Sequence, residues 1–278
     1  MIRQIEDDFD LEKIAGSGQC FRWRQVGENA YRIPHRAFCL TIRSLGGAVF
    51  EMDCNEEQFE RVWRGYFDLD TDYRAIRGRI DPGEDPFLYR AAQNETGIRI
   101  LRQDPWETLV SFIISQNRNI PAIRRSVESL CEAAGEEMRD GYGNRWYAFP
   151  PPMAVAGLDE SVLTACRLGY RCSYVKRAAQ AVASGAVDLD GLLSADLESA
   201  MERLTALYGV GNKVASCVAL FGLHRLDAFP VDVWMRRILE NEYPRGYPME
   251  RYRPFNGVYQ QYMFAWYRSA VRRAGEPG

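Results

Sequence analysis

The stretch that decides the fold is residues 200–240, AMERLTALYGVGNKVASCVALFGLHRLDAFPVDVWMRRILE. Apolar residues at helical spacing lead into Gly209-Val210-Gly211, and a second helical pattern follows directly. Two glycines around a small apolar residue allow the backbone to turn sharply and to approach another molecule closely. The unpaired N–H groups of the helix that begins near Asn212 would face that molecule. A glycine pair can also be an ordinary tight turn, but this context favours a helical hairpin that binds phosphate.

Lys213 lies in the first turn of that second helix. It is one of only three lysines, with Lys13 and Lys176, so 32 of the 35 basic residues are arginine. The positive end of the helix dipole opposes a charged amine there and favours the neutral, nucleophilic form. Partial burial beside apolar Val214 and Phe221 would have the same effect. Most lysines are solvated surface charges, but this position favours a reactive amine.

Asp232 follows Pro230 and Val231 and precedes the helical pattern of residues 233–240. It is therefore the expected N-cap of that helix. Capping is compatible with chemistry, because a carboxylate held at a helix start stays anionic and stabilises positive charge that develops nearby. Alone, Asp232 would be only a cap. With Lys213 nineteen residues earlier, it becomes a candidate second catalytic group.

Length and composition are those of an ordinary globular chain. The 278 residues are 46% hydrophobic and 26% charged, and the formal net charge is −3. A chain of this length can bury a sizeable core in two or three subdomains. The acidic balance argues against the broad basic surface of a histone-like or repressor-like binder. A nucleic-acid site would therefore depend on local geometry and backbone amides.

The N-terminus and the cysteines indicate the compartment. Residues 1–16 are acidic and lack an apolar run, so they resemble neither a signal peptide nor a transit peptide. No run of about 18 apolar residues occurs, so no membrane span is expected. The seven cysteines include no CxxC pair, which favours reduced thiols, and two histidines disfavour a His-based metal site. A cytoplasmic monomer without a targeting signal is expected.

Short runs rich in aromatic and β-branched residues predict an antiparallel sheet within residues 18–52. The expected strands are Gln19–Val26, Ala30–Ile33, Ala37–Leu45 and Ala48–Met52. Helical patterns fill most of the rest. The expected helices are Pro86–Asn94, Pro105–Gln116, Asn119–Ala134, Glu160–Leu168, Arg171–Ser184, Ser194–Leu207, Gly209–Leu223, Val233–Glu240 and Tyr259–Ala274. Residues 135–152 are expected to wrap the surface. The loop 81–86 divides an N-terminal β-containing domain, 1–84, from a helical region, 85–278, so the predicted fold class is α+β.

Four motifs carry a family resemblance. The run from Leu204 to Arg237, with Gly-Val-Gly-x-Lys-Val-Ala and Pro-Val-Asp-Val, resembles the helix-hairpin-helix (HhH-GPD) DNA glycosylases. Three further segments resemble the 8-oxoguanine DNA glycosylase branch, namely SGQCFRW (17–23), SQNRNI (115–120) and LGYR (168–171). The resemblance covers nearly the whole chain in order. Length and acidic balance are similar to the short bacterial forms of that branch.

The resemblance implies a fold and an activity. The N-terminal β unit would resemble half of a TATA-binding-protein fold, and two helical subdomains would hold the active site between them. Lys213 would attack C1′ of a flipped-out 8-oxoguanine nucleotide in duplex DNA, form a Schiff base and cleave the strand by β-elimination. Asp232 would stabilise the oxocarbenium-like state and orient the lysine. The chain would thus act in base excision repair on the bacterial nucleoid.

The resemblance also implies roles for individual residues. The carbonyl oxygen of Gly18 would accept the extra N7 proton that distinguishes 8-oxoguanine from guanine. The other substrate-binding candidates are Cys217, Phe221, Pro230, Phe264 and Arg268. Tyr170 would wedge into the gap left by the base, and Asn117 and Arg171 would contact the orphaned opposite base. The remaining DNA-binding candidates are Arg118, Asn119, Gly209, Val210, Gly211, Val233 and Trp234. Core packing remains the alternative for Tyr170, Cys217 and Phe221, and helix capping for Asn117.

The chain departs from the family pattern at four positions. Phe264 stands where eukaryotic members have a glutamine that reads the base edge, and Arg268 stands where they have a stacking phenylalanine. Ala122 replaces an arginine that helps to enforce pairing opposite cytosine, and Trp234 replaces a histidine. These differences predict a relaxed opposite-base preference.

No cofactor is expected to be required. Family members bind a metal ion through hairpin carbonyls, and the matching carbonyls here are those of Thr205, Leu207 and Val210. The ion would be Na⁺, K⁺, Ca²⁺ or Mg²⁺ in contact with a DNA phosphate. An iron–sulfur cluster is not expected, because no cysteine follows Cys217.

The sequence favours three other functions less. Monofunctional alkylpurine glycosylases of the same superfamily lack a lysine at the position of Lys213. The adenine glycosylase and endonuclease III group usually carries four cysteines near the C-terminus. A non-catalytic hairpin module would hold the DNA backbone without needing Lys213 and Asp232 together. Each alternative is therefore weaker than the bifunctional enzyme, and another purine lesion remains the alternative substrate.

Overall fold

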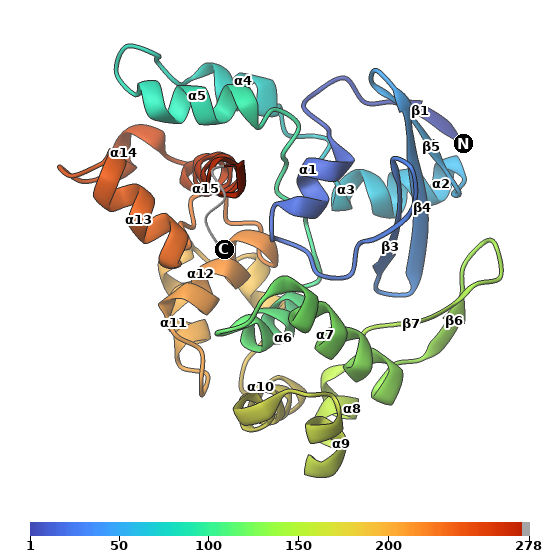
Figure 1. Cartoon of the computed structure of the whole chain (residues 1–278). Coiled ribbons are helices and arrows are strands. Elements are labelled where there is room, and N and C mark those ends of the chain that lie inside the picture. Colours follow the sequence, from blue (N-terminus) through green and yellow to red (C-terminus); the bar gives the residue numbers. More distant parts are fainter. Residues whose placement is uncertain (274–278) are drawn as a thin grey trace.

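The N-terminal part of the chain forms a five-stranded antiparallel sheet with strand order β1-β5-β4-β3-β2 (Figure 1). The structure is a computed structural model and describes residues 1–273. The strands are β1 (Ile2–Gln4), β2 (Arg24–Gly27), β3 (Ala30–His35), β4 (Phe38–Gly46) and β5 (Val49–Met52). Alternate side chains of β4 and β5, such as Leu40 and Ile42, or Phe50 and Met52, are buried, as expected where one face of a sheet covers a core.

The start of the sheet differs from the sequence prediction. The strand expected over residues 19–26 is only β2, because residues 17–23 form an anchored loop. In that loop Gln19 donates from Nε2 to the carbonyl of Arg99 (2.8 Å), and its Oε1 accepts the N–H of Leu101 (2.8 Å). Strand β1 and helix α1 (Leu11–Gly16) were not predicted. The three residues of β1 pair with β5, a contact that a local pattern cannot indicate.

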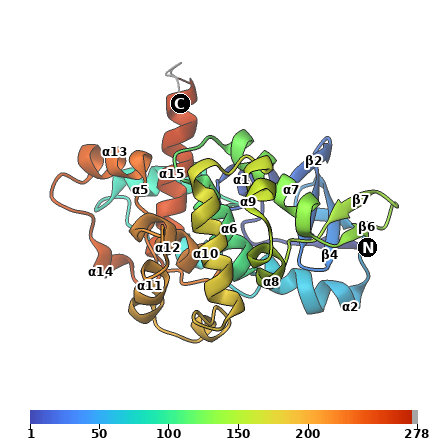
Figure 2. The same ribbon diagram turned by 90° about the horizontal axis from the view of Figure 1, so that it is seen from below.

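Helices make up most of the remainder (Figures 1 and 2). Residues 56–66 form a continuous helical segment of α2 (Glu56–Gln58), a π-helical turn η1 (Phe59–Trp63) and α3 (Arg64–Tyr66). The later helices are α4 (Tyr73–Gly78), α5 (Pro86–Asn94), α6 (Pro105–Ser115), α7 (Ile120–Ala134), α8 (Pro152–Ala156), α9 (Glu160–Ala165), α10 (Cys172–Ala183), α11 (Leu197–Thr205), α12 (Asn212–Phe221), α13 (Val233–Glu242), α14 (Met249–Tyr252) and α15 (Asn256–Arg273). Short 3₁₀ turns are η2 (Gly169–Arg171) and η3 (Gly191–Leu193). The predicted α+β class is confirmed.

One helix boundary and one surface segment correct the sequence prediction. Residues 135–152 contain a hairpin of β6 (Glu137–Arg139) and β7 (Arg145–Tyr147), and the short helix α8 begins at its end. Asp140 closes the hairpin by accepting the N–H groups of Tyr142 (3.0 Å) and Asn144 (2.8 Å). Helix α15 begins at Asn256, three residues before the predicted start at Tyr259. Its predicted end at Ala274 lies outside the described residues.

The buried side chains form two hydrophobic cores. One core lies between the sheet and residues 56–67 and contains Leu40 and Trp63. The other core joins the helices, and it takes in Phe21 from the N-terminal loop as well as Tyr73 from α4. The predicted domain division at residues 84 and 85 stays a prediction, since the second core already includes side chains that precede it.

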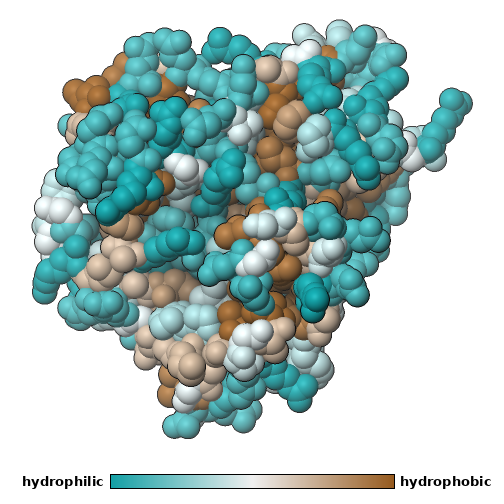
Figure 3. Space-filling view, turned by 180° about the vertical axis from the view of Figure 1, so that it is seen from behind, coloured by the Kyte–Doolittle hydropathy of each residue, from teal (hydrophilic) through white to brown (hydrophobic). Residues whose placement is uncertain are grey.

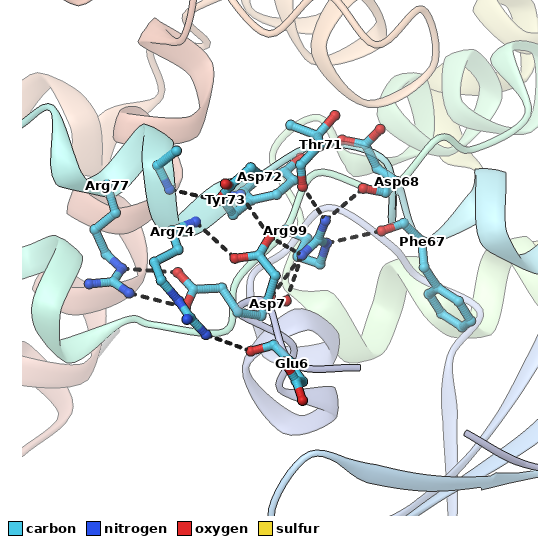
Figure 4. A network of polar contacts seen from close by, with 12 residues as sticks. Glu6, Asp7, Phe67, Asp68, Thr71, Asp72, Tyr73, Arg74, Arg77 and Arg99 are labelled. Atoms are coloured by element: carbon cyan, nitrogen blue, oxygen red, sulfur yellow. Dashed lines mark hydrogen bonds and ion pairs between the residues drawn. The ribbon is translucent and has the colours of Figure 1, made fainter. Parts of the chain in front are cut away.

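Arg99 joins the N-terminal segment to the helical region (Figure 4). Its guanidinium is fully buried and donates to the carbonyls of Asp7 (2.7 Å), Phe67 (3.1 Å), Asp68 (2.6 Å) and Thr71 (2.7 Å). It also pairs with the Asp7 carboxylate at 3.0 Å. A buried charge is tolerated only when it is paired and hydrogen-bonded, and this one is. The contact fixes three segments that are distant in sequence.

His35 gives the sheet a pH-dependent stability. Burial lowers the pKa of His35 from 6.5 to about 4, and the ring packs 4.6 Å from that of Tyr66. The unfolded chain therefore binds a proton between these values that the folded chain does not bind, so stability falls as the pH drops through this window. We expect His35→Phe to flatten this part of the stability curve, measured by urea unfolding at steps between pH 7 and pH 4. Equal slopes for both proteins would contradict the assignment.

Hydrophilic side chains cover most of the face shown in Figure 3, and apolar side chains reach the surface in several patches. Among residues 1–273, no helix combines the length and apolar character needed to cross a membrane. Three large exposed side chains belong to the predicted DNA-binding segments or adjoin them, namely Tyr170, Tyr208 and Val233.

Candidate active site and nucleic-acid interface

The predicted glycine hairpin joins α11 to α12. Gly209 has φ +81°, and a Cβ at this position would lie 2.4 Å from Cγ of Tyr174, so both conformation and space require glycine. The N–H of buried Val210 donates to the carbonyl of Leu207 at 3.0 Å and closes the turn. Gly211 caps α12 without a side chain, and nothing lies within 4 Å of a Cβ built there. Gly211 and Asn212 are exposed, so the start of α12 is accessible to another molecule, as a phosphate seat requires.

Lys213 projects from the first turn of α12 over an aromatic stack. Its Nζ lies 5.0 Å from the ring centroid of Phe112, a residue of α6. The Phe112 ring stacks on that of Phe221 with centroids 5.5 Å apart and an interplanar angle of 17°. Both phenylalanines are buried, whereas Lys213 is only half-buried. The amine is thus held against an apolar surface that restricts its motion, while it stays accessible from outside.

Lys213 and Asp232 both affect the ionisation of the Cys217 thiol. Burial raises the pKa of the Cys217 thiol to about 11, the Lys213 amine opposes this shift, and the Asp232 carboxylate adds to it. Both charged groups therefore lie near the same buried sulfur, one helical turn from Lys213. The raised pKa keeps Cys217 a neutral thiol at pH 7, so it does not compete with the lysine as a nucleophile.

Asp232 has the predicted capping role. Its Oδ1 accepts the N–H of Met235 at 2.9 Å at the start of α13. The cap fixes the carboxyl group and occupies one of its oxygens, which leaves Oδ2 able to serve another partner. Asp232 therefore caps α13, and its carboxylate also acts on the ionisation of Cys217.

A second wall of the site comes from the Gly18 loop and α15. Gly18 has φ +83°, and a Cβ built on it would lie 3.6 Å from Cε1 of Phe264 and 3.7 Å from Nη1 of Arg268. The Arg268 guanidinium also lies 5.0 Å from the ring centroid of Phe264. Residues near opposite ends of the chain are therefore neighbours, as the predicted substrate pocket requires.

Pro230 is fixed by a residue that sequence reasoning missed. Gln260 of α15, one turn before Phe264, is buried and donates from Nε2 to the carbonyl of Pro230 at 3.0 Å. Gln261 donates in turn to Oε1 of Gln260 at 2.9 Å. An amide side chain therefore lies between the Pro230 turn and the Phe264 wall.

The predicted wedge and opposite-base residues lie on two adjoining loops. Tyr170 is 55% exposed at η2, which leaves the ring free to contact DNA. Asn117 is exposed and adopts a left-handed conformation, with φ +52°. The helix cap that was considered for Asn117 is made instead by Asn119, whose Oδ1 accepts the N–H of Ala122 at 3.0 Å. Asn117 therefore keeps its side chain available.

Two arginines predicted to touch DNA are engaged within the protein. Arg171 is buried and donates from Nε to the carbonyl of Gln116 at 2.9 Å and from Nη1 to that of Leu168 at 3.1 Å. Arg118 donates to Oγ of Ser126 at 2.6 Å and to the carbonyl of Arg167. Burial and the neighbouring Arg171 lower the pKa of Arg118. In this conformation both side chains hold loops in place.

The start of α13 offers a further surface near Asp232. Val233 is 65% exposed. Trp234 is half-buried, with its ring 6.3 Å from that of Tyr267 and 5.1 Å from the guanidinium of Arg237. The exposed valine and the supported tryptophan ring are compatible with a contact to a DNA backbone.

The three carbonyls predicted to hold a metal ion lie at the end of α11 and in the turn that follows it. That of Leu207 already accepts the N–H of Val210 at 3.0 Å. A carbonyl oxygen has two lone pairs, so this bond leaves room for an ion. Within residues 1–273 no group of three or more His, Cys, Asp or Glu side chains could hold a metal.

A surface pocket lined by residues such as Trp106, Phe149 and Asp188 shares no lining residue with these groups. The candidate site around Lys213 is therefore separate from that pocket.

Comparison with known proteins identifies the family. Residues 1–109 match the 8-oxoguanine DNA glycosylase N-terminal domain, and residues 110–244 match the HhH-GPD superfamily of base excision DNA repair proteins. A solved 8-oxoguanine glycosylase/lyase of Clostridium acetobutylicum, in complex with double-stranded DNA containing cytosine opposite 8-oxoguanine, is 31% identical. The alignment covers 99% of each chain with a TM-score of 0.88. The chain belongs to the 8-oxoguanine DNA glycosylase family. The family assignment from sequence is confirmed.

This glycosylase is also similar to two curated proteins. A probable N-glycosylase/DNA lyase of Methanothermobacter thermautotrophicus is 29% identical, over 85% of this chain and 83% of the relative. An N-glycosylase/DNA lyase of Saccharomyces cerevisiae is 35% identical, over 69% of this chain and 54% of the relative. The glycosylase thus aligns with about half of the yeast protein.

Several residues that shape the glycosylase site were missed from sequence. In the sequence, Phe112 and Gln260 look like core positions of helices. Their contacts are with other elements, so no local pattern marks them. Tyr174, beneath Gly209, had no signal beyond an aromatic residue four positions after Tyr170. Only the structure shows which of the many aromatic residues adjoin the hairpin.

Proposed function

We propose that the protein is a bifunctional DNA glycosylase/AP lyase that excises 8-oxoguanine from duplex DNA and then cleaves the strand. The observation that carries the proposal is the position of Lys213. The only lysine of the hairpin lies at the start of α12, over Phe112 and close to Cys217 and Asp232. An amine held beside a carboxylate and above a phosphate seat suits attack on a deoxyribose carbon.

The chemistry needs only these residues and the substrate. The Nζ lone pair forms a bond to C1′, while the electrons of the C1′–N9 bond leave with the purine, which takes up the proton released from Nζ. The C1′–O4′ bond then breaks, O4′ takes up the remaining Nζ proton, and an imine forms between Nζ and C1′. Loss of a C2′ proton to water forms a double bond between C2′ and C3′, and the 3′ phosphate leaves with the electrons of its bond to C3′, which completes β-elimination. The Asp232 carboxylate stabilises positive charge on the sugar throughout these steps.

Base recognition is assigned to the wall opposite the lysine. The Gly18 carbonyl would accept the N7 proton of 8-oxoguanine, since glycine allows close approach. We assign base-edge reading to Gln260 and ring stacking to Phe264. Each lies one helical turn before the position inferred from sequence, where Phe264 and Arg268 were aligned with the glutamine and phenylalanine of the family. A one-turn shift preserves the face of α15 and restores the family's pair of side chains.

DNA binding is assigned to the loops around the lysine. The amides of residues 209–211 would hold the phosphate, and the exposed ring of Tyr170 would fill the gap that the flipped base leaves. Asn117 would contact the opposite base, and Val233 and Trp234 would contact the backbone. The hairpin carbonyls of Thr205, Leu207 and Val210 would add an ion between protein and phosphate. We propose that the protein acts as a monomer in the cytoplasm.

Borohydride trapping tests the proposal. Wild-type protein and borohydride are mixed with a duplex that contains one 8-oxoguanine, and the product is digested for mass spectrometry. We expect a covalent protein–DNA adduct on the damaged strand, attached to the peptide that carries Lys213, and none with undamaged duplex. DNA binding without any adduct would refute the bifunctional mechanism. An adduct with other purine lesions only would reassign the substrate.

The opposite-base preference should be relaxed. Ala122 provides no guanidinium where other family members have an arginine, and Arg171 is engaged by backbone carbonyls. We therefore expect excision rates opposite C, A, G and T to lie within about tenfold, since one lost bidentate contact corresponds to about 1–3 kcal/mol of discrimination. Single-turnover kinetics on the four duplexes measure this. Ala122→Arg should increase the preference for cytosine, whereas a strict cytosine requirement in wild type would contradict the prediction.

A further inference from the structure

A row of three tyrosines links the wedge loop to the phosphate hairpin. The ring of Tyr174, in α10, meets that of Tyr170 edge-on, with centroids 5.7 Å apart and an angle of 75°. On its other side it meets the ring of Tyr208 at 5.2 Å and 82°. The backbone of Gly209 lies against the same ring, since a Cβ there would be 2.4 to 2.7 Å from three of its carbons. Tyr174 therefore touches the wedge and the hairpin at once.

Gln116 makes a second connection between the same two loops. Its Nε2 donates to the carbonyl of Gly209 at 3.1 Å, and its own carbonyl accepts Nε of Arg171 at 2.9 Å. The Arg171 guanidinium lies 4.2 Å from the ring centroid of Tyr170. The contacts thus form a closed circuit from Tyr170 through Tyr174, Gly209, Gln116 and Arg171 back to Tyr170.

The circuit ties together four elements of the helical region. Helices α6, α10, α11 and α12 lie close together (Figure 2), and the loops that carry the circuit are at their ends. Dispersion attraction falls steeply with distance, so a ring in close contact with a glycine backbone resists displacement of that backbone. The hydrogen bond from Gln116 is a second restraint on the hairpin. Movement of the hairpin would therefore carry the wedge with it.

We propose that Tyr174 and Gln116 are positioning residues that couple phosphate binding at the hairpin to insertion of Tyr170 into the base stack. The inference rests on the proposed function and adds residues to it that touch neither the base nor the sugar. Binding of a phosphate to the amides of residues 209–211 then determines how far the Tyr170 ring enters the base stack. Base flipping and backbone binding occur as one event in place of two independent ones.

The test compares substrates that do and do not need a base to be flipped. Tyr174→Leu is expected to slow excision of 8-oxoguanine from a duplex by about tenfold, within the range of coupling between neighbouring residues. Cleavage of a preformed abasic site in single-stranded DNA should change by less than about twofold, because no wedge is needed there. Tyr174→Phe keeps the ring and should restore the duplex rate. Fluorescence of 2-aminopurine placed beside the lesion should show reduced unstacking with Tyr174→Leu.

A double-mutant cycle tests whether Tyr174 and Gln116 act through Tyr170. If Tyr174 acts through the wedge, then Tyr174→Leu should add little to Tyr170→Ala, and the same should hold for Gln116→Ala. Tyr142→Leu, at an exposed tyrosine on the β6–β7 turn, is the matched control and should leave every rate unchanged. Thermal unfolding checks that each variant is folded, and Gln116→Ala provides an independent probe if Tyr174→Leu is not.

Three outcomes would overturn the inference while leaving the proposed function intact. These are wild-type kinetics for Tyr174→Leu and Gln116→Ala, equal losses on duplex and single-stranded substrates, or fully additive effects with Tyr170→Ala. Absence of any covalent adduct with the wild-type protein would instead refute the proposed function. The wild-type trapping reaction run beside the variants therefore separates the two failures.

Discussion

Lys213→Gln is expected to abolish the borohydride-trapped adduct and to lower excision of 8-oxoguanine by at least about 10³-fold, as loss of a nucleophile does in other covalent enzymes. Glutamine keeps a flexible polar side chain that is one atom shorter, but it has no amine with which to form an imine. The stack of Phe112 and Phe221 beneath it should remain, because those rings pack on each other. Adduct yield and single-turnover rates on a damaged duplex are the measurements.

The chain offers a matched control, because it has so few lysines. Lys176 donates from Nζ to the carbonyl of Leu158 at 2.8 Å, and it lies in α10. Lys176→Gln should retain the adduct and the excision rate. DNA affinity of Lys213→Gln, measured by fluorescence anisotropy, should stay close to wild type, since hairpin amides make the phosphate contact. An adduct that persists in Lys213→Gln would require a different nucleophile.

Arg99→Met is expected to lower the free energy of unfolding by about 3–5 kcal/mol, which is typical when one partner of a buried charge network is removed. The substitution leaves the carbonyls of Phe67, Asp68 and Thr71 without their donor (Figure 4). It also leaves the Asp7 carboxylate without its buried partner. Urea unfolding measures the change, and an unchanged m-value would show that the unfolding transition is the same one.

Arg64→Met is the control for loss of an arginine as such. Arg64 is an exposed side chain that pairs with Asp70 at 2.7 Å. Exposed pairs contribute little, because water and salt screen them. We expect its unfolding midpoint to match that of wild type within the scatter of the measurement. If Arg99→Met were as stable as Arg64→Met, the Arg99 network would not hold the N-terminal segment to the helical region.

The proposed catalytic pair, Lys213 and Asp232, could be inferred from sequence because its signals are local. Gly209 and Gly211 mark a turn, Lys213 follows within the first helical turn, and Asp232 immediately precedes the next helix. Such spacings depend only on the geometry of a helix and its caps. The structure places these residues as a local pattern requires, and it adds the Phe112 ring beneath the amine. That ring comes from α6 and has no signal near Lys213 in the chain.

Other parts of the site depended on register or on distant partners. Gln260 was overlooked because every turn of α15 presents similar apolar and aromatic residues, so a one-turn shift fits the pattern equally well. Arg171 was expected to face DNA, but it is buried against carbonyls of the loop after α6. A buried arginine is rare unless its donors are satisfied, and one of the acceptors, the carbonyl of Gln116, lies 55 residues away.

By itself the sequence determined the helical hairpin, the aspartate that caps α13 and the lysine between them. It also determined the hydrophobic periodicity of most helices. These follow from interactions among residues a few positions apart. Only the tertiary structure decided which distant loops meet: Gly18 with Phe264, Gln116 with Gly209, and β1 with β5. Such contacts form only when packing across the whole molecule offsets the chain entropy that is lost as distant segments are brought together. No local pattern therefore encodes them. The residues proposed for the chemistry were readable in sequence, whereas the contacts between distant loops exist only in the fold.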